Sequence, residues 1–323
     1  MTSRNTVIIY NPSAGAFKQR RRKHWLDQSV DVLRSHGGEV EVRPTTGPGA
    51  AVDMARQSIK DGADLILAAG GDGTVNEVIN GMVFSKVPLG ILPAGTANVL
   101  AMELGMGTRM VRTAQELPTY VAERIAVGEF RVGPQAGPRY FALMAGIGLD
   151  AHIVYKLNPG MKSSIGKLAY WVAGFSQLGR RLPEFTVTVN GVSYRASFAL
   201  ASRVRNYGGD LEIAPSVSLL DETLELVLFS GENSFGYLKY MLGVALGRLQ
   251  GMRGVTILRT TSVRCTAPDD SRVYVQVDGE HAGQLPFEID VIPQALTLLV
   301  PPDFHIRRPL SLPEAAWTTS PTR

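Results

Sequence analysis

The strongest chemical signal in the chain is the stretch DLILAAGGDGTVNEVING at residues 64–81. Its apolar run at residues 65–69 predicts a buried strand, and the apolar residues after position 74 follow the i, i+3, i+4, i+7 spacing of an amphipathic helix. Three glycines lie between the two, where the backbone must turn sharply into a helix N-terminus. Unpaired N–H groups and the positive end of the helix dipole make such a corner an anion site, and phosphate is the expected anion.

One carboxylate, Asp72, stands inside this glycine corner. It would repel a phosphate unless it orients the loop through N–H groups or meets a cation such as Mg²⁺. A lone glycine turn is as often a plain strand-to-helix connection, and this one is neither a Walker A loop nor GxGxxG. The presence of the Asp72 carboxylate favours the interpretation of this glycine corner as a ligand site.

Two further predicted strands end in the same kind of turn. Residues 6–10 lead into NPSAG at 11–15, and residues 88–92 lead into PAGTAN at 93–98. Strands alternate with helices up to about residue 125, which predicts a mostly parallel sheet with helices on both faces. Other elements expected here are a strand at 39–43 and helices at 16–36, 50–60 and 99–104. Ligands bind at the carboxyl ends of such strands, where the three corners should converge.

From about residue 126 the pattern changes to short strands separated by turns, which predicts an antiparallel β-sandwich. The expected strands cover 129–132, 140–145, 185–189, 193–202, 224–229, 255–264, 272–277 and 287–291, with helices at 165–178 and 235–249. The apolar stripe around Trp171 either packs in the core or meets a membrane interface. The Pro-, Ser- and Thr-rich residues 309–323 are expected to be disordered.

Composition limits the functional classes. The single Cys265 excludes an internal disulfide framework and, with five scattered histidines, a Cys/His zinc cluster. The chain has no 18-residue apolar run and no signal-peptide pattern, so we expect a cytoplasmic protein. The net charge of +4 is spread through the chain, and we do not expect a nucleic-acid partner. The oligomeric state is not fixed by these observations, and a homodimer is one option.

Five blocks together closely resemble the diacylglycerol kinase catalytic-domain family, which includes bacterial soluble lipid kinases, sphingosine kinases and ceramide kinases. They are NPSAG, GGDGTVNEVING, LPAGTANVLA, AGIGLDA at 145–151 and VDGE at 277–280. The resemblance covers about residues 6 to 305. It implies two domains, 1–125 and 126–295, with 296–308 packing back on the first, and ATP in the cleft between them. It also implies Mg²⁺ and a hydroxyl-bearing lipid acceptor at a membrane surface.

The resemblance places one set of residues around the nucleotide. Glycine N–H groups can hold phosphates there, and threonine hydroxyls can donate hydrogen bonds; Thr46 is as good a candidate as its neighbour Thr45. For Asn76 and Glu77 the alternatives are ligand contact and helix capping. The full set is Asn11, Pro12, Ser13, Ala14, Gly15, Thr45, Gly71, Asp72, Gly73, Thr74, Val75, Asn76, Glu77 and Thr96.

The VDGE block carries two carboxylates, Asp278 and Glu280, on either side of a glycine. The plainer interpretation is a polar β-turn. With the resemblance we favour a catalytic role, in which a positioned carboxylate accepts the proton of the lipid hydroxyl. Glu280 is the favoured base, with Asp278 as base or orienter, and Asp72 is the third catalytic candidate.

The resemblance also implies a structural Mg²⁺. Asp221 matches the metal-binding Asp of the family, and the carbonyl groups of Ser218 and Thr223 match its partners. Glu222 stands where the family commonly has Gly.

The predicted function is therefore an ATP-dependent lipid kinase. The alternatives are an NAD kinase, which also carries a GGDGT loop, and a non-catalytic nucleotide- or lipid-binding module. Diacylglycerol, a sphingoid base, ceramide, phosphatidylglycerol and a prenol all present a hydroxyl beside an apolar body, and the sequence does not choose among them.

Overall fold

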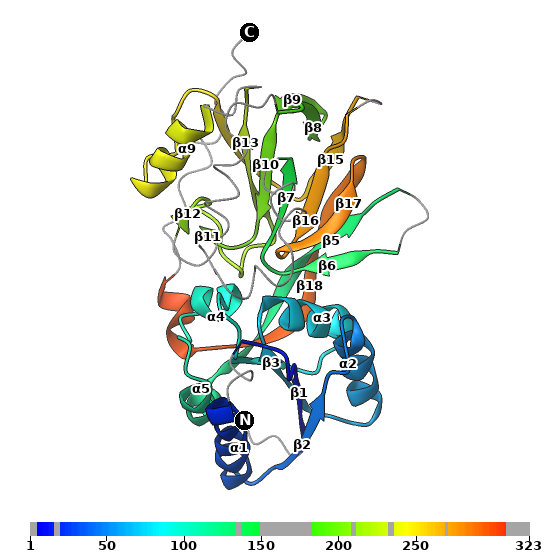
Figure 1. Cartoon of the computed structure of the whole chain (residues 1–323), viewed down its shortest axis with the longest axis vertical. Coiled ribbons are helices and arrows are strands. Elements are labelled where there is room, and N and C mark those ends of the chain that lie inside the picture. The colour runs from blue at the N-terminus through cyan, green and yellow to red at the C-terminus, as the bar shows by residue number, and fades with distance from the viewer. Residues whose placement is uncertain are drawn as a thin grey trace. The chain divides into compact units, whose positions relative to one another are not determined.

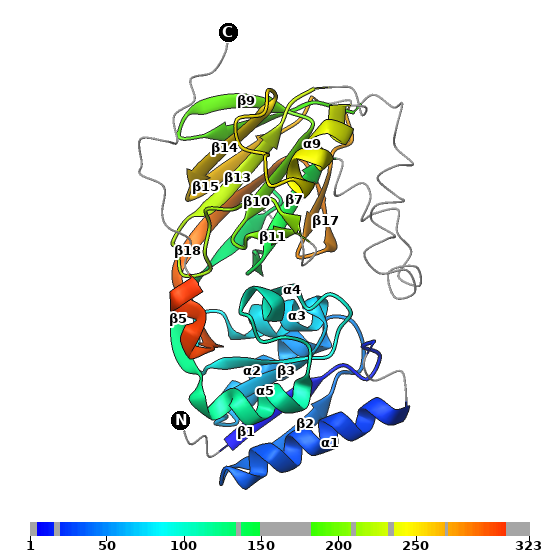
Figure 2. The same ribbon diagram turned by 90° about the vertical axis from the view of Figure 1, so that its left-hand side faces the viewer.

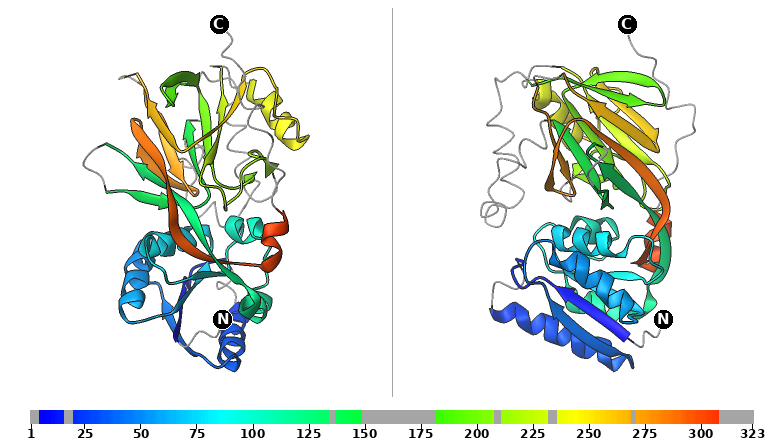
Figure 3. Two further views of the ribbon diagram at one scale, coloured as in Figure 1. Left: turned by 180° about the vertical axis from the view of Figure 1, so that it is seen from behind. Right: turned by 90° about the vertical axis from the view of Figure 1, so that its right-hand side faces the viewer.

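The structure is a computed structural model that describes residues 5–15, 20–133, 137–148, 182–207, 211–231, 236–268 and 271–307. The chain divides into two compact units, Met1–Val127 with Pro293–Arg308, and Gly128–Ile292 with Pro309–Arg323. Strands β5 (Val121–Arg131) and β18 (Phe287–Val300) contribute to both units. Figure 3 shows β18 as one long continuous strand in orange-red.

The first unit is built on a parallel sheet in the order β2-β1-β3-β4-β18. All six residues of β3 are buried, as its apolar run predicts. The strand order reverses between β1 and β3, because β1 has β2 on its other side. The bounds are β1 Asn5–Tyr10, β2 Glu39–Pro44, β3 Leu65–Gly70 and β4 Leu89–Pro93.

Helices cover both faces of this sheet. Helix α2 packs on α3, and α1 packs on α5; Figures 1 and 2 show one pair on each face. Gly81 lets α2 and α3 approach closely, because a Cβ there would lie 2.4 Å from the Val52 carbonyl oxygen. The bounds are α1 Arg20–Ser35, α2 Ala50–Lys60, α3 Asp72–Met82, α4 Val99–Glu103, α5 Met110–Glu116, η1 Leu117–Thr119 and η2 Pro302–Arg307.

The second unit contains an antiparallel sheet in the order β14-β13-β10-β7-β16-β17 and a second group of strands, β18-β15-β8-β9 with β5 and β6. Strand β13 is buried along its whole length. The bounds are β6 Arg139–Phe141, β7 Met144–Gly148, β8 Phe185–Val189, β9 Val192–Ala196, β10 Phe198–Ser202, β11 Asn206–Tyr207, β12 Leu211–Glu212, β13 Leu224–Phe229, α9 Gly236–Ala245, β14 Val255–Thr260, β15 Ser262–Thr266, β16 Tyr274–Val277 and β17 Glu280–Gln284.

The predicted fold class, a parallel α/β unit followed by an antiparallel β-sandwich, is confirmed. Three expected strands are each observed as two strands that belong to different sheets. The strand expected at 140–145 is β6 and β7, the one expected at 193–202 divides at Ser197 into β9 and β10, and the one expected at 255–264 divides at Thr261 into β14 and β15. Such a change of sheet leaves no trace in the sequence pattern, because both halves keep β-forming residues. The strand expected at 287–291 continues to Val300, and α5 was not expected.

The helix expected at 165–178 and the tail at 309–323 lie outside the described residues. The helix expected at 235–249 is observed as Gly236–Ala245. Among the helices that the structure describes, none has both the length and the apolar character that crossing a membrane requires.

Candidate active site

The first corner is tied to the second by a side chain. Asn11 follows β1, and its main-chain N–H donates to the Ala69 carbonyl of the neighbouring strand at 3.1 Å. The Asn11 amide donates to the Thr74 hydroxyl at 3.2 Å, and its oxygen accepts the Ser13 N–H at 2.8 Å. Because β1 and β3 are adjacent at the reversal of strand order, their turns meet at the place where parallel sheets bind ligands.

The second and third corners touch through their glycines. A Cβ on Gly95 would lie 2.4 Å from the Gly71 Cα, so only glycines allow this approach. Asn98 fixes the third corner: its φ is 49°, its oxygen accepts the Gly95 N–H at 2.7 Å, and its amide donates to the Gly95 carbonyl at 3.0 Å. Asn98 was not among the predicted site residues, although asparagine tolerates the left-handed conformation better than other non-glycine residues.

Asp72 begins α3 and faces the start of α4. Its Oδ1 lies 3.5 Å from the Leu100 N–H. Burial raises the pKa of Asp72, and the main-chain N–H groups of Leu100, Val99 and Asn98 oppose that rise. The geometry therefore matches the loop-orienting alternative for this carboxylate, since it links the second corner to the third.

Two neighbours of the glycine corner make internal contacts. The Glu77 carboxylate accepts the N–H groups of Gly49 at 2.8 Å and Ala51 at 3.1 Å, so it caps the N-terminus of α2. Asn76 is buried, and its side-chain oxygen accepts the Asn80 amide at 3.2 Å. These contacts agree with a capping and packing role for both side chains.

The remaining residues predicted to surround the nucleotide lie at or beside the three corners, and they differ in exposure. Thr45 donates its main-chain N–H to the Tyr10 carbonyl at 2.8 Å, which places it beside the end of β1. A Cβ on Gly15 would lie 3.3 Å from the Thr96 hydroxyl, so the first and third corners are also close. Ala14 and Val75 are buried, Gly73 is half-buried in the first turn of α3, and Pro12, Ser13 and Thr96 are exposed.

The two carboxylates of VDGE have different environments within the second unit. Asp278 is buried, has a φ of 48°, and accepts three main-chain N–H groups, from Ala142 at 3.3 Å, Leu143 at 3.2 Å and Met144 at 2.9 Å. It therefore anchors the turn to the start of β7. The Glu280 side chain is 46% exposed.

Arg139 on β6 pairs with Glu280. Its Nη2 lies 2.7 Å from the Glu280 Oε2, and its Nη1 donates to the His281 carbonyl at 3.5 Å. Sequence reasoning missed Arg139, because 141 positions separate the two partners and only the fold brings them together.

The oxygens expected to hold a structural Mg²⁺ are already hydrogen-bonded. The Ser218 carbonyl accepts the Asp221 N–H at 2.9 Å, the Asp221 Oδ2 lies 3.2 Å from the Arg259 Nη2, and the Thr223 carbonyl accepts the Arg203 Nη1 at 3.1 Å. Two guanidinium groups thus contact two of the three expected ligand oxygens, and a loop N–H contacts the third, so this donor set does not fit a divalent cation. Among the described residues, no group of three or more acidic, histidine or cysteine side chains is placed to bind a metal.

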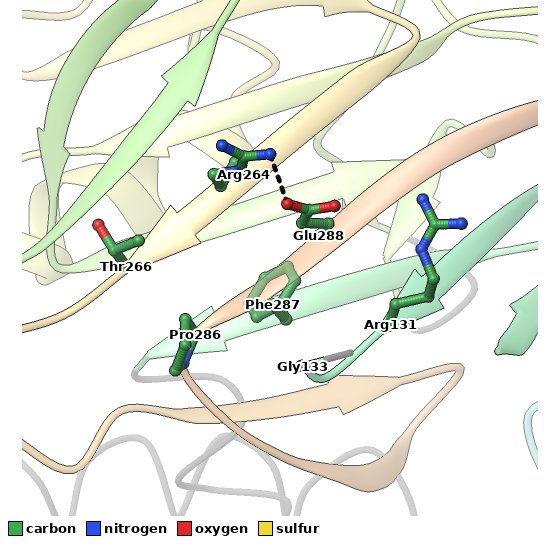
Figure 4. Close-up of a pocket in the computed structure, with 7 residues that line it drawn as sticks. All are labelled: Arg131, Gly133, Arg264, Thr266, Pro286, Phe287 and Glu288. Atoms are coloured by element: carbon green, nitrogen blue, oxygen red, sulfur yellow. Dashed lines mark ion pairs between the residues drawn. The ribbon is translucent and has the colours of Figure 1, made fainter. Parts of the chain in front are cut away.

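A pocket of about 320 Å³ lies between β5, β15 and β18 (Figure 4). Arg264 and Glu288 form an ion pair of 2.6 Å at its rim, and Arg131 pairs with Glu129 and Asp290. None of the predicted site residues lines it.

The chain resembles known proteins over most of its length. Residues 5–130 match the family model described as diacylglycerol kinase catalytic domain, and residues 144–300 match the one described as YegS C-terminal NAD kinase beta sandwich-like domain. In fold, it is similar to a crystal structure titled as a diacylglycerol kinase from Bacillus anthracis, with a TM-score of 0.76, 21% identity, and coverage of 94% of this chain and 98% of that one.

Curated relatives agree with these matches. A diacylglycerol kinase of Bacillus subtilis is 30% identical over 289 residues, which cover 87% of this chain and 91% of that protein. A diacylglycerol kinase of Mycobacterium tuberculosis is 28% identical over 287 residues, 87% of each chain. The predicted resemblance is confirmed, and the chain belongs to the diacylglycerol kinase catalytic-domain family.

Proposed function

We propose that the protein is an ATP-dependent lipid kinase that transfers the γ-phosphate of ATP to the hydroxyl of a lipid such as diacylglycerol. The observation that carries the proposal is the meeting of three glycine corners at one edge of the parallel sheet, in a chain that belongs to a kinase family. Main-chain N–H groups at such corners hold phosphates without any side-chain charge.

In this proposal the corners bind and orient ATP, which enters as its Mg²⁺ complex. The ion neutralises charge on the phosphates when it is bound. Asp72 keeps the second corner against α4, and Asn98 keeps the third corner folded. Phosphoryl transfer needs mainly positioning and charge stabilisation from the protein, which a rigid main-chain cradle supplies.

Glu280 is the proposed general base. Its carboxylate accepts the lipid hydroxyl proton while the lipid oxygen bonds to the γ-phosphorus and the bond to the β,γ-bridging oxygen breaks, which releases ADP. Asp278 cannot take this role without losing contacts, because its oxygens accept three N–H groups. Asp278 is therefore the proposed orienter, and Arg139 holds the Glu280 carboxylate in place.

The test is transfer of label from γ-labelled ATP to a panel of hydroxylated lipids in mixed micelles with Mg²⁺. Glu280→Gln should lower turnover by about 10²–10⁴-fold, the usual contribution of a general base. Glu288→Gln is the matched control, since Glu288 is also an exposed glutamate paired with an arginine of the same unit. Equal turnover of the two variants would reject Glu280 as the base.

The same assay with NAD as acceptor separates the lipid kinase from the NAD kinase alternative. Labelled NADP with no labelled lipid would establish that alternative. ATP binding with no labelled product from either acceptor would indicate a binding module.

A further inference from the structure

Arg203 is a fully buried cation whose side chain gathers main-chain carbonyl groups. It follows β10, and its exposed fraction is 0%. Its guanidinium donates to the carbonyl oxygens of Leu219 at 3.0 Å, Asp221 at 2.9 Å and Thr223 at 3.1 Å. Burial lowers the pKa of Arg203 to about 10, and the side chain therefore stays charged at neutral pH. A buried charge is tolerated only where such contacts replace water.

A second guanidinium completes the arrangement. The Arg259 Nη2 lies 3.2 Å from the Asp221 Oδ2 and also donates to the Ser216 carbonyl. The same Asp221 oxygen accepts the Ser218 N–H at 3.0 Å. The loop from Ser216 to Thr223 therefore directs its oxygens at two arginines, much as an oxygen cage is directed at a metal ion.

Arg203 also connects this loop to the turn that carries the two carboxylates of VDGE. Its main-chain N–H donates to the Leu143 carbonyl at 2.8 Å. The Leu143 and Met144 N–H groups donate to the Asp278 carboxylate, and the Asp278 N–H donates to the Met144 carbonyl at 2.9 Å. One residue thus touches the loop with its side chain and the strand segment that anchors Asp278 with its main chain.

We propose that Arg203 takes the place of a structural divalent cation in this chain and positions the Asp278 turn through residues 142–144. The Arg203 guanidinium binds the loop carbonyl groups that an ion would otherwise bind, and the Arg259 guanidinium binds the Asp221 carboxylate and the Ser216 carbonyl. Arg203 is a positioning residue, and only the kinetic part of the proposal rests on the proposed kinase function.

The first test uses nucleotide-free wild-type protein. Thermal unfolding with EDTA and with added Mg²⁺ should give the same Tm, because no metal stabilises the loop. A lower Tm in EDTA that Mg²⁺ restores, and that Asp221→Asn abolishes, would overturn the proposal. This measurement needs no catalytic activity, so it stands even if the proposed function fails.

The second test compares two variants of Arg203 with one control. Arg203→Met should lower the Tm by roughly 5–10 °C, because three carbonyl groups lose their partner. Arg203→Lys keeps the charge but not the fork of donors, so it should fold with a smaller loss. Arg195→Met, which changes an arginine that is 76% exposed on β9, should leave the Tm unchanged. Equal values for Arg203→Met and Arg195→Met would contradict the inference.

The third test separates positioning from mere folding. Folded Arg203→Lys should lose about tenfold or more in kcat, while the KM for ATP stays unchanged because the glycine corners belong to the first unit. A wild-type kcat in that variant would refute the positioning role and leave Arg203 as a loop stabiliser only.

A separate observation concerns the surface of α9. Leu242 and Leu246 are 60% and 61% exposed, and Leu246 donates its N–H to the Leu242 carbonyl, so the two lie one helical turn apart. Tyr240 on the same helix is buried and donates its hydroxyl to the Ser230 carbonyl, which fixes the helix to its unit. We name Leu242 and Leu246, with the exposed Lys239, Arg248 and Arg253, the α9 surface.

The charge around this surface has one sign. Residues 233–268 contain five basic residues and no acidic one. Two of the basic residues, Arg259 and Arg264, pair with acidic side chains from other segments, which leaves the three basic residues of the α9 surface. Exposed leucines among lysine and arginine suit the interface of a bilayer that carries anionic headgroups.

We propose that the α9 surface docks the protein on an anionic phospholipid membrane. The role for a lipid kinase rests on the proposed function, but the binding itself does not. Each cation near such a membrane is worth roughly fivefold in binding, and each buried leucine adds to that.

The test is co-sedimentation with vesicles of phosphatidylglycerol and phosphatidylcholine, and with phosphatidylcholine alone. Wild type should prefer the anionic vesicles, and Leu242→Ser/Leu246→Ser should bind them at least tenfold more weakly. Val192→Ser, which changes another exposed apolar residue of the second unit, is the control. Unchanged vesicle binding of the double variant, or a change only in its oligomeric state, would overturn the proposal.

A kinase assay with a short-chain, water-soluble diacylglycerol separates docking from catalysis. The double variant should keep wild-type activity in that assay and lose it on long-chain lipid in vesicles. Loss in both assays would contradict a role limited to docking.

Discussion

The contact between Gly71 and Gly95 allows a direct test of whether the glycine corners form one site. Gly95→Ala would place a methyl group 2.4 Å from the Gly71 Cα and 2.8 Å from the Asn98 Oδ1. Carbon atoms in contact normally lie about 3.5–4.0 Å apart. The second and third corners must therefore separate by about 1 Å or more, or the Asn98 clamp must open.

The expected cost follows from that displacement. Overpacking of this kind costs ~1–3 kcal/mol. A unit of this size loses roughly 2–4 °C in Tm for each kcal/mol, so we expect a fall in Tm of about 2–12 °C. Because a misplacement of about 1 Å can cost 100-fold in rate, we expect kcat/KM for ATP to fall by about that factor. Thermal unfolding and phosphate transfer to lipid measure the two effects separately.

Gly47→Ala is the matched control, since Gly47 lies in the same unit with open space around it. Its Tm and turnover should match wild type. If Gly95→Ala also matched wild type in both measurements, the two corners would not form a rigid unit, and the proposed phosphate cradle would be wrong.

Three further results are expected. Asp72→Asn should abolish phosphate transfer, yet in denaturant titrations at neutral pH it should be at least as stable as wild type. Burial raises the pKa of Asp72 in the folded protein. The stability that this carboxyl group contributes is therefore fully present below its ordinary pKa and is lost as the pH rises through its pKa in the folded protein. Glu77→Ala should lower the free energy of unfolding by ~1–2 kcal/mol, because α2 loses two capping contacts. Cys265 is buried and its pKa is raised, so a thiol reagent should label it only as fast as the protein opens.

The parts of the fold that sequence predicts are those encoded locally. The strand before Gly70 and the helix after it differ in periodicity, and the glycines between them mark the boundary. The rule that ligands bind at the carboxyl edge then places the corners together without any contact being known. Asn98 was missed because its role depends on one backbone conformation that residue type only permits.

The contacts that escaped prediction are long-range. In the sequence, Arg203 is an ordinary charged residue after a predicted strand, and the neighbouring residues give no sign that its side chain is buried. Its partners belong to a loop that reaches it only because β10 pairs with β13 in one register. The family pattern predicted a cation at this loop, and the contacts of Arg203 with its carbonyl groups could be seen only in the structure.

The shared strand segment implies that Arg203 and Asp278 act together. Both bind residues 142–144, Arg203 through the Leu143 carbonyl and Asp278 through the Leu143 N–H. Residues coupled through one backbone segment show interaction energies of ~0.5–3 kcal/mol in double-mutant cycles, whereas independent positions add. Arg203→Lys and Asp278→Asn should therefore cost less in combination than the sum of the single losses in free energy of unfolding. Strict additivity would mean that the loop and the turn are held independently, and that the position of the carboxylate turn does not depend on the buried arginine.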